Sequence, residues 1–202
     1  RRKTYYIKFG KFLYGRYTFE SEAKKDIQPA TNRLKQIGIS VFSARVVENG
    51  NDYSIEIEYI NKVDDIIEPS RNPLYSISSY TCEEEFLFED NALIEGEKRT
   101  QVFSKTSINP IHVYAYPKDN DWSFVIDFAV KNIYRGGVFI GKEYLIKRYF
   151  NSQEFDFETE AKKEMQEKIN NFNQAGLYVI SSKIYDIGNA YSFYIDYIEK
   201  QR

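Results

Sequence analysis

The feature that most constrains the fold is a hairpin-like segment that the chain spells three times. Residues 49–60 read NGNDYSIEIEYI, residues 118–129 read KDNDWSFVIDFA and residues 187–198 read IGNAYSFYIDYI, so the spacing is 69 residues both times. A longer comparison agrees: residues 19–62 and 157–200 align without a gap and share 20 identities in 44 positions. Self-similarity at a fixed period predicts one structural unit built three times.

Each unit is predicted to contain a strand, a helix and two further strands. In the first copy Ala23, Ile27, Ala30 and Leu34 recur at helical spacing on an otherwise polar segment. Alternating apolar residues follow on both sides of the turn Asn49-Gly50-Asn51, which is typical of an antiparallel hairpin. The prediction is therefore an α+β fold of three tandem βαββ repeats, each with one helix packed on a sheet face.

The middle copy departs from this pattern in its helix. Gly96 and Arg99 replace apolar residues of the stripe, and Pro110 lies at the start of the following strand. Glycine lowers helix stability by about 1 kcal/mol relative to alanine, and proline lacks a ladder donor. We expect this helix to be shorter or looser than the other two.

The order of elements resembles the strand–helix–strand–strand module of dodecins and of GyrI-like ligand-binding proteins. The resemblance covers the topology of each repeat and carries no shared motif, so it implies a fold for the unit and no function.

The period divides the chain into residues 1–69, 70–138 and 139–202, which are expected to pack as one compact body. Residues 62–73 contain two prolines and predict a linker, whereas residues 131–142 are partly apolar and predict strand through Tyr134 and residues 138–140.

Composition excludes several classes of function. The net charge is −2 with both signs interspersed, so no nucleic-acid partner is expected. No apolar run approaches the roughly 20 residues that span a bilayer. The chain does not begin with Met and its strands are rich in Tyr and Asn. These features favour a secreted or cell-envelope protein slightly over a phage or cytosolic one.

Catalytic and metal-binding chemistry finds little support. Cys82 precedes three glutamates, whose charge raises a thiol pKa, and His112 is the single histidine, so no two-histidine metal site forms within one chain. Gly136-Gly137 lacks the strand and helix of a phosphate-binding loop. We expect no cofactor and no enzymatic activity.

The candidate binding residues lie on the sheet face opposite the helix. Glu58, Asp127 and Asp196 are acidic in all three copies and alternate with core residues, so they point to that face. The neighbouring strand contributes further side chains to it: Arg45, His112, Tyr114, Tyr116 and Lys183. One interpretation is a cross-strand ion pair in the first and third copies, worth under ~1 kcal/mol; the other is a charged surface that docks a partner.

The predicted function is therefore non-enzymatic binding, with another protein as the partner and an open sheet surface as the site. A small-ligand carrier with a cleft between repeats is the alternative.

Overall fold

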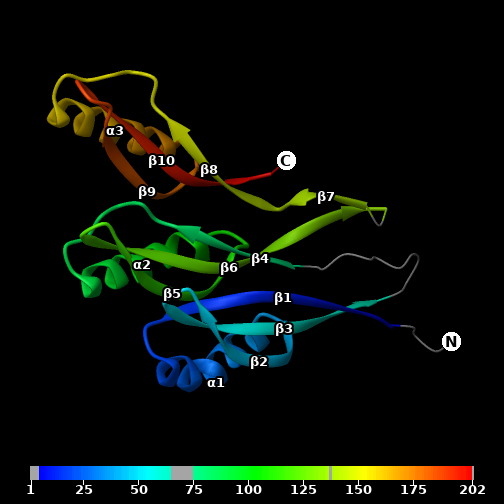
Figure 1. Cartoon of the computed structure of the whole chain (residues 1–202). Coiled ribbons are helices and arrows are strands. Elements are labelled where there is room, and N and C mark those ends of the chain that lie inside the picture. Colours follow the sequence, from blue (N-terminus) through cyan, green and yellow to red (C-terminus); the bar gives the residue numbers. More distant parts are fainter. Residues whose placement is uncertain (1–4, 65–74, 137, 202) are drawn as a thin grey trace.

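A computed structural model describes residues 5–64, 75–136 and 138–201 (Figure 1). In this part of the chain the fold is α+β, with three helices and ten strands. The elements follow one another in this order: β1 (Tyr5–Tyr17), α1 (Glu20–Gln36), β2 (Ser40–Asn49), β3 (Asp52–Asp64), β4 (Tyr75–Thr81), α2 (Glu89–Ser104), β5 (Asn109–Lys118), β6 (Asp121–Arg135), β7 (Val138–Lys142), β8 (Tyr144–Phe150), α3 (Glu158–Gln174), β9 (Tyr178–Asp186) and β10 (Tyr191–Lys200).

The strands form three antiparallel sheets in the orders β1-β3-β2, β4-β6-β5 and β8-β10-β9. We call the four elements from β1 to β3 the first unit, those from β4 to β6 the second unit and those from β8 to β10 the third unit. Figure 1 shows the three units stacked in chain order, with the three helices toward the left side of the view. In each sheet the last strand of the unit is central because the hairpin pairs on one side of it and the first strand pairs on the other.

The joins between units differ. The boundary expected at residues 69 and 70, and most of the predicted linker, lie outside the described residues. The boundary expected between residues 138 and 139 falls inside β7, which pairs with the extension of β6 through Tyr134. The strand predicted across this second join is therefore present.

Each helix begins directly after an extended phenylalanine. Phe19, Phe88 and Phe157 have φ between −119° and −124°, and acidic residues occupy the first turn of all three helices. Negative charge at this end is favourable because it meets the positive end of the helix dipole. Gly38, which follows α1, has φ of +88°, a conformation that only glycine adopts without strain.

The middle helix is not loosened by its glycine. α2 has 16 residues against 17 in α1 and in α3, and Gly96 is buried. A Cβ atom at Gly96 would lie 2.6 Å from Cγ1 of Val113 and 3.0 Å from the ring of Phe124. Of the expectation of a shorter or looser helix, only the length holds, by one residue, and the missing side chain at Gly96 lets α2 approach β5 and β6 closely.

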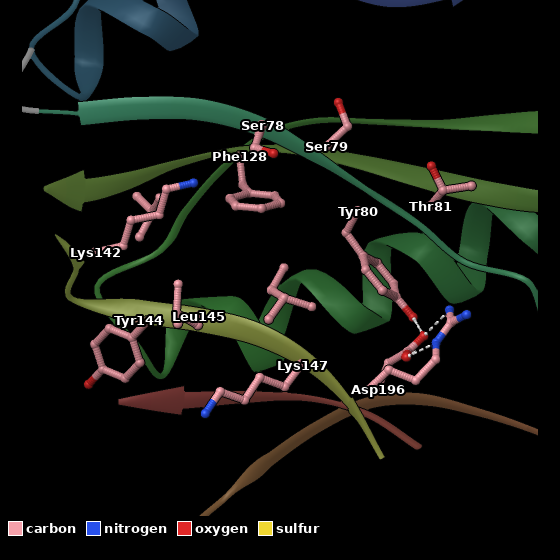
Figure 2. A pocket seen from close by; sticks show the side chains of 13 residues that line it. Ser78, Ser79, Tyr80, Thr81, Phe128, Lys142, Tyr144, Leu145, Lys147 and Asp196 are labelled. Carbon is pink, nitrogen blue, oxygen red and sulfur yellow. Dashed lines mark hydrogen bonds and ion pairs between the residues drawn. The ribbon is translucent and has the colours of Figure 1, made fainter. Parts of the chain in front are cut away.

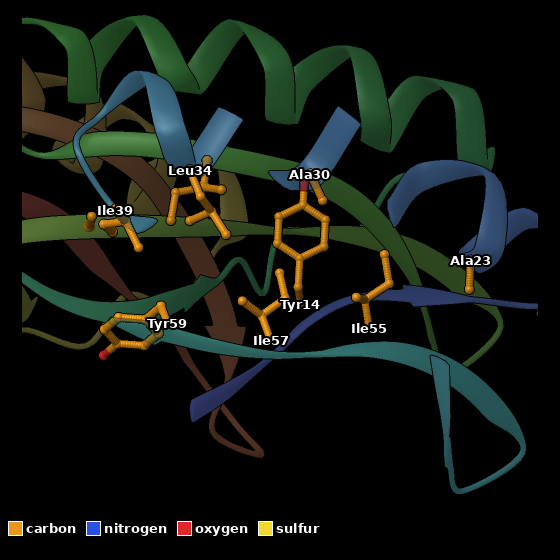
Figure 3. Packing of buried hydrophobic residues seen from close by; sticks show 10 residues of the cluster. Tyr14, Ala23, Ala30, Leu34, Ile39, Ile55, Ile57 and Tyr59 are labelled. Atoms are coloured by element: carbon orange, nitrogen blue, oxygen red, sulfur yellow. The ribbon is translucent and has the colours of Figure 1, made fainter. Parts of the chain in front are cut away.

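The units share their hydrophobic cores. The first cluster packs Ala23, Ala30 and Leu34 of α1 against Tyr14, Ile55 and Ile57 (Figure 3), and it includes Ile111 and Ala129 of the second unit. The second cluster contains Phe103, Phe124 and Phe128 of the second unit together with Ile180 and Ile198 of the third. Each cluster is therefore closed by the unit that follows it.

Candidate functional site

The acidic row occupies the same place in each sheet but not the same environment. We call the sheet face opposite the helix of its own unit the open face. The Glu58 side chain on the first open face is 35% exposed, whereas Asp127 and Asp196 are each 2% exposed. The expectation of an exposed charged surface therefore fails for the last two, because the open faces of the second and third sheets are covered by the preceding unit.

The first junction, where the second open face meets the first unit, buries Asp127. Its Oδ2 accepts a 3.3 Å hydrogen bond from the backbone N–H of Gly15, and its Oδ1 accepts one of 2.5 Å from Ser79. Burial raises the pKa of Asp127 to about 6, against the opposing effect of these two hydrogen bonds.

His112 and Tyr114 also lie in the first junction. The His112 ring stacks on Tyr14 with the ring centroids 4.6 Å apart, and its Nδ1 lies 3.5 Å from Nη1 of Arg33. Burial lowers the pKa of His112 to about 4, so the ring is neutral at pH 7. Tyr114 packs on His112 at 5.8 Å, while Tyr116 donates a 2.5 Å hydrogen bond to the carbonyl oxygen of Cys82.

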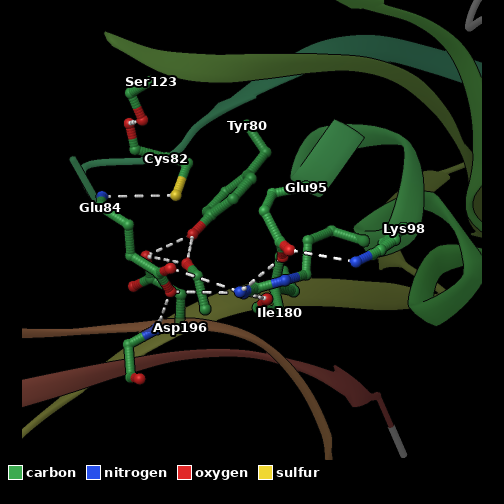
Figure 4. A network of polar contacts seen from close by, with 11 residues as sticks. Tyr80, Cys82, Glu84, Glu95, Lys98, Ser123, Ile180 and Asp196 are labelled. Carbon is green, nitrogen blue, oxygen red and sulfur yellow. Dashed lines mark hydrogen bonds and ion pairs between the residues drawn. The ribbon is translucent and has the colours of Figure 1, made fainter. Parts of the chain in front are cut away.

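The second junction, where the third open face meets the second unit, is more polar. Asp196 accepts hydrogen bonds from Tyr80 at 2.6 Å and from Nε of Arg148 at 2.7 Å. Tyr80 is also hydrogen-bonded to Ser181. Figure 4 shows Tyr80 reaching from the second unit toward Asp196. The buried carboxylate is thus satisfied from two units at once.

The run Glu83-Glu84-Glu85 also reaches across the second junction, a role that the sequence analysis missed. Each glutamate has its own partner in the third unit: Tyr194 donates to Glu83 at 2.7 Å, the backbone N–H of Ser182 donates to Glu84 at 2.8 Å, and Lys183 lies 3.5 Å from Glu85. An acidic run following a strand gives no sign of its partner, so only the stacking of units reveals this contact.

The predicted cross-strand ion pairs have different partners. Nη2 of Arg45 lies 2.8 Å from Glu56 rather than beside Glu58, because Arg45 and Glu56 are directly opposite in the ladder. Glu58 instead pairs with Lys11 at 3.6 Å. Lys183 pairs with Glu85 of the second unit rather than with Asp196. The ladder of the third sheet places Ser181 opposite Asp196 and Lys183 opposite Tyr194, so strand register explains this result as well.

A cavity of about 370 Å³ lies at the second junction (Figure 2). Phe128, Leu145 and Ile146 supply apolar walls, and Ser78 and Arg148 supply polar groups. The cavity is of the size that holds a small organic molecule, and it lies between two units.

The open face of the first sheet is left exposed. In all three sheets one residue of the strand after the helix forms a bulge, at Phe42, Ile111 and Ile180. Ile111 and Ile180 are 6% and 1% exposed within the junctions, whereas Phe42 is 60% exposed. Arg45 and Lys11 are also exposed on this unit. The first unit therefore presents to solvent the kind of face that the other two bury.

Cys82 is the cysteine that the sequence analysis considered as a nucleophile. Cys82 is buried, and burial raises the pKa of its thiol, with Glu84 adding to the effect. Among the described residues, no three metal-ligating side chains cluster, and no helix is long and apolar enough to cross a membrane.

Comparison with known proteins returned no match to a protein-family model, a curated protein or a solved structure.

Proposed function

We propose that this chain is a non-enzymatic protein-interaction protein that binds its partner through the open face of the first sheet. In this proposal the three units are tandem copies of one βαββ repeat, and a copy recognises other protein surfaces by the face opposite its helix. The single observation that supports it most is the contrast at the bulge, where Phe42 is 60% exposed while Ile111 and Ile180 are buried against a neighbouring unit.

The chemistry of this face fits protein recognition. An exposed aromatic ring and Leu13 supply apolar area, and Lys11, Arg45 and Glu58 surround them with both signs of charge. Apolar anchors within a polar rim are the usual anatomy of an interface, where the rim charges set specificity and orientation. Of the eight predicted binding residues, Arg45 and Glu58 carry this proposal.

Site-specific photo-crosslinking tests it. A photoreactive residue in place of Leu13, which is 47% exposed, should capture a protein from extracts of the source cells, or a second copy of the chain. The same residue in place of Leu87, which is 70% exposed on the second unit, is the control and should capture nothing specific. Identical captured species at both positions, or none at position 13, would contradict the proposal.

A small-ligand carrier is the second candidate, supported by the cavity at the second junction. Arg148 lines the cavity but already pairs with Asp196, whereas Ser78, Thr81 and Lys142 supply further polar groups to the lining. Native mass spectrometry of the purified protein tests this reading. A bound molecule that Ser78→Trp removes would support it, and an unchanged mass shift in that variant would place the ligand elsewhere.

A further inference from the structure

The helix side of the second unit carries the surface against which the open face of the third unit packs. On its helix side Tyr80, Phe103 and Phe128 form an aromatic trio, with ring centroids 6.3 Å apart for the first pair and 5.5 Å for the second. The third open face covers this trio, and all three rings are buried. Beside it, Glu85 reaches Lys183 of the covering face.

The third unit repeats this surface 69 residues later. Tyr149, Phe172 and Tyr197 form the same trio, with centroid distances of 5.5 Å and 5.1 Å. These rings are only partly buried, and Glu154, at the position of Glu85, is exposed. We call Tyr149, Glu154, Phe172 and Tyr197 the tail surface.

The first unit repeats the covering face. Ser43, Arg45 and Glu58 lie 138 residues before Ser181, Lys183 and Asp196, the groups that contact the second unit. The likeness extends to the first strand. Lys11 is opposite Glu58 in the ladder, as Arg148 is opposite Asp196. We call Phe42, Ser43, Arg45 and Glu58 the head surface.

We propose that the partner of the head surface is a second copy of this chain, docked by its tail surface. The inference rests on the proposed function of the first open face. In the contact the Tyr149 hydroxyl donates a hydrogen bond to Glu58 and is also hydrogen-bonded to Ser43. The Tyr80 hydroxyl makes the equivalent hydrogen bonds with Asp196 and Ser181 at the second junction. Glu154 pairs with Arg45, as Glu85 does with Lys183. The Phe42 ring takes the place of Ile180 beside the aromatic trio.

The association is heterologous, because head and tail are different surfaces of one chain. Such a contact leaves a free head and a free tail on every dimer, so it extends into longer stacks of copies. It is weaker than the internal junctions for two reasons. Ser152 and Gln153 replace two glutamates of the second unit, and no linker supplies a millimolar effective concentration.

Sedimentation velocity on the full chain, from about 1 µM to about 1 mM, tests the proposal over this range of affinity. The wild type should shift to larger species as concentration rises. Phe42→Asp blocks the head and Glu154→Arg blocks the tail, and each variant alone should lose at least about tenfold in association constant. Leu87→Asp, on neither surface, should associate as the wild type does.

Mixing the two blocked variants gives the decisive result. One variant retains a free tail and the other a free head, so an equimolar mixture should form a heterodimer and nothing larger. Circular dichroism and thermal unfolding of each variant should show an intact fold, because each substituted side chain is exposed.

A wild type that stays monomeric throughout, or a Phe42→Asp variant that associates normally, would overturn the head-to-tail contact. If the wild type is monomeric while position 13 still crosslinks to a different protein, the proposed function stands and only the identity of the partner is wrong. If neither occurs, both fail.

Discussion

The Tyr80 hydroxyl donates a 2.6 Å hydrogen bond to Oδ2 of Asp196, joining residues that lie 116 positions apart in the chain. Tyr80 belongs to β4 of the second unit and Asp196 to β10 of the third, so this hydrogen bond contributes to the stability of the junction between the two units. Its loss affects the junction without altering either unit's own ladder.

Removing that hydroxyl should destabilise the protein. Tyr80→Phe leaves a buried carboxylate with one donor fewer, and hydrogen bonds to charged groups are worth about 1.5–3 kcal/mol. Urea unfolding should show a loss of this order. Tyr149→Phe is the matched control at protein concentrations too low for two copies to associate, because within one chain the Tyr149 hydroxyl makes only a 3.4 Å contact with Asn151. Equal losses in the two variants would contradict the role of the Asp196 contact.

Gly96→Ala should destabilise the protein although alanine is the better helix former. The new methyl group would meet Val113 at 2.6 Å, so α2 must move away from β5. Overpacking of this kind costs about 1–3 kcal/mol. Glu97→Ala, at the neighbouring exposed position, should change the free energy of unfolding little. A Gly96→Ala variant more stable than the wild type would show that the helix is not closely packed there.

Pro29→Glu should stabilise the protein. Pro29 lies inside α1 and is exposed, and it removes a backbone donor from the helix. α3 has Glu167 at the corresponding place, 138 residues later. We expect a gain of about 1–3 kcal/mol in the free energy of unfolding. The reciprocal variant Glu167→Pro should lose a similar amount, and thermal unfolding of both checks the pair.

His112 and Asp127 should make opposite contributions to the pH dependence of stability. The pKa of His112 falls from 6.5 to about 4, so below pH 6.5 the unfolded state binds the proton more readily. Stability from this group is therefore lost as pH falls from 6.5 to 4. The pKa of Asp127 rises from 3.8 to about 6, so the folded state binds its proton more readily and stability is lost as pH rises from 4 to 6.

Single variants separate the two effects. Relative to the wild type, Asp127→Asn should gain stability as pH rises from 4 to 6, and His112→Gln should lose it, each by about 2 kcal/mol. Urea unfolding at several pH values between 4 and 7 measures both. Parallel profiles for the wild type and both variants would show that neither group titrates abnormally in the folded state.

The local elements could be predicted from the sequence because their causes are local. The apolar spacing of Ala23, Ala30 and Leu34 indicated α1, and those three residues are the buried ones. Alternation around Asn49-Gly50-Asn51 indicated the hairpin, whose strands meet at Asn49 and Asp52. The close packing of α2 at Gly96 could not be predicted from the sequence, because Val113 and Phe124 approach this glycine only in the folded structure.

The sequence predicted which sheet face the candidate binding residues occupy, but not whether that face is exposed or buried. Alternation placed Asp127 and Asp196 opposite the core of their own units, and they lie there. Whether that face meets water depends on the neighbouring unit, which periodicity within one strand does not encode. The sequence of the acidic run after β4 likewise did not indicate that Glu84 would bind the backbone N–H of Ser182 or that Glu85 would pair with Lys183.

The sequence by itself determined the unit: its helix stripe, its hairpin and the acid on the face opposite the helix, since each follows from spacing along the chain. Only the tertiary structure decided that units stack face to helix, burying two of the three acids and leaving Glu58 partly exposed. The physical reason is that an open sheet face with both polar and apolar side chains can either remain in water or pack against a neighbouring unit that satisfies its polar groups. The choice depends on which surface the connected neighbour presents.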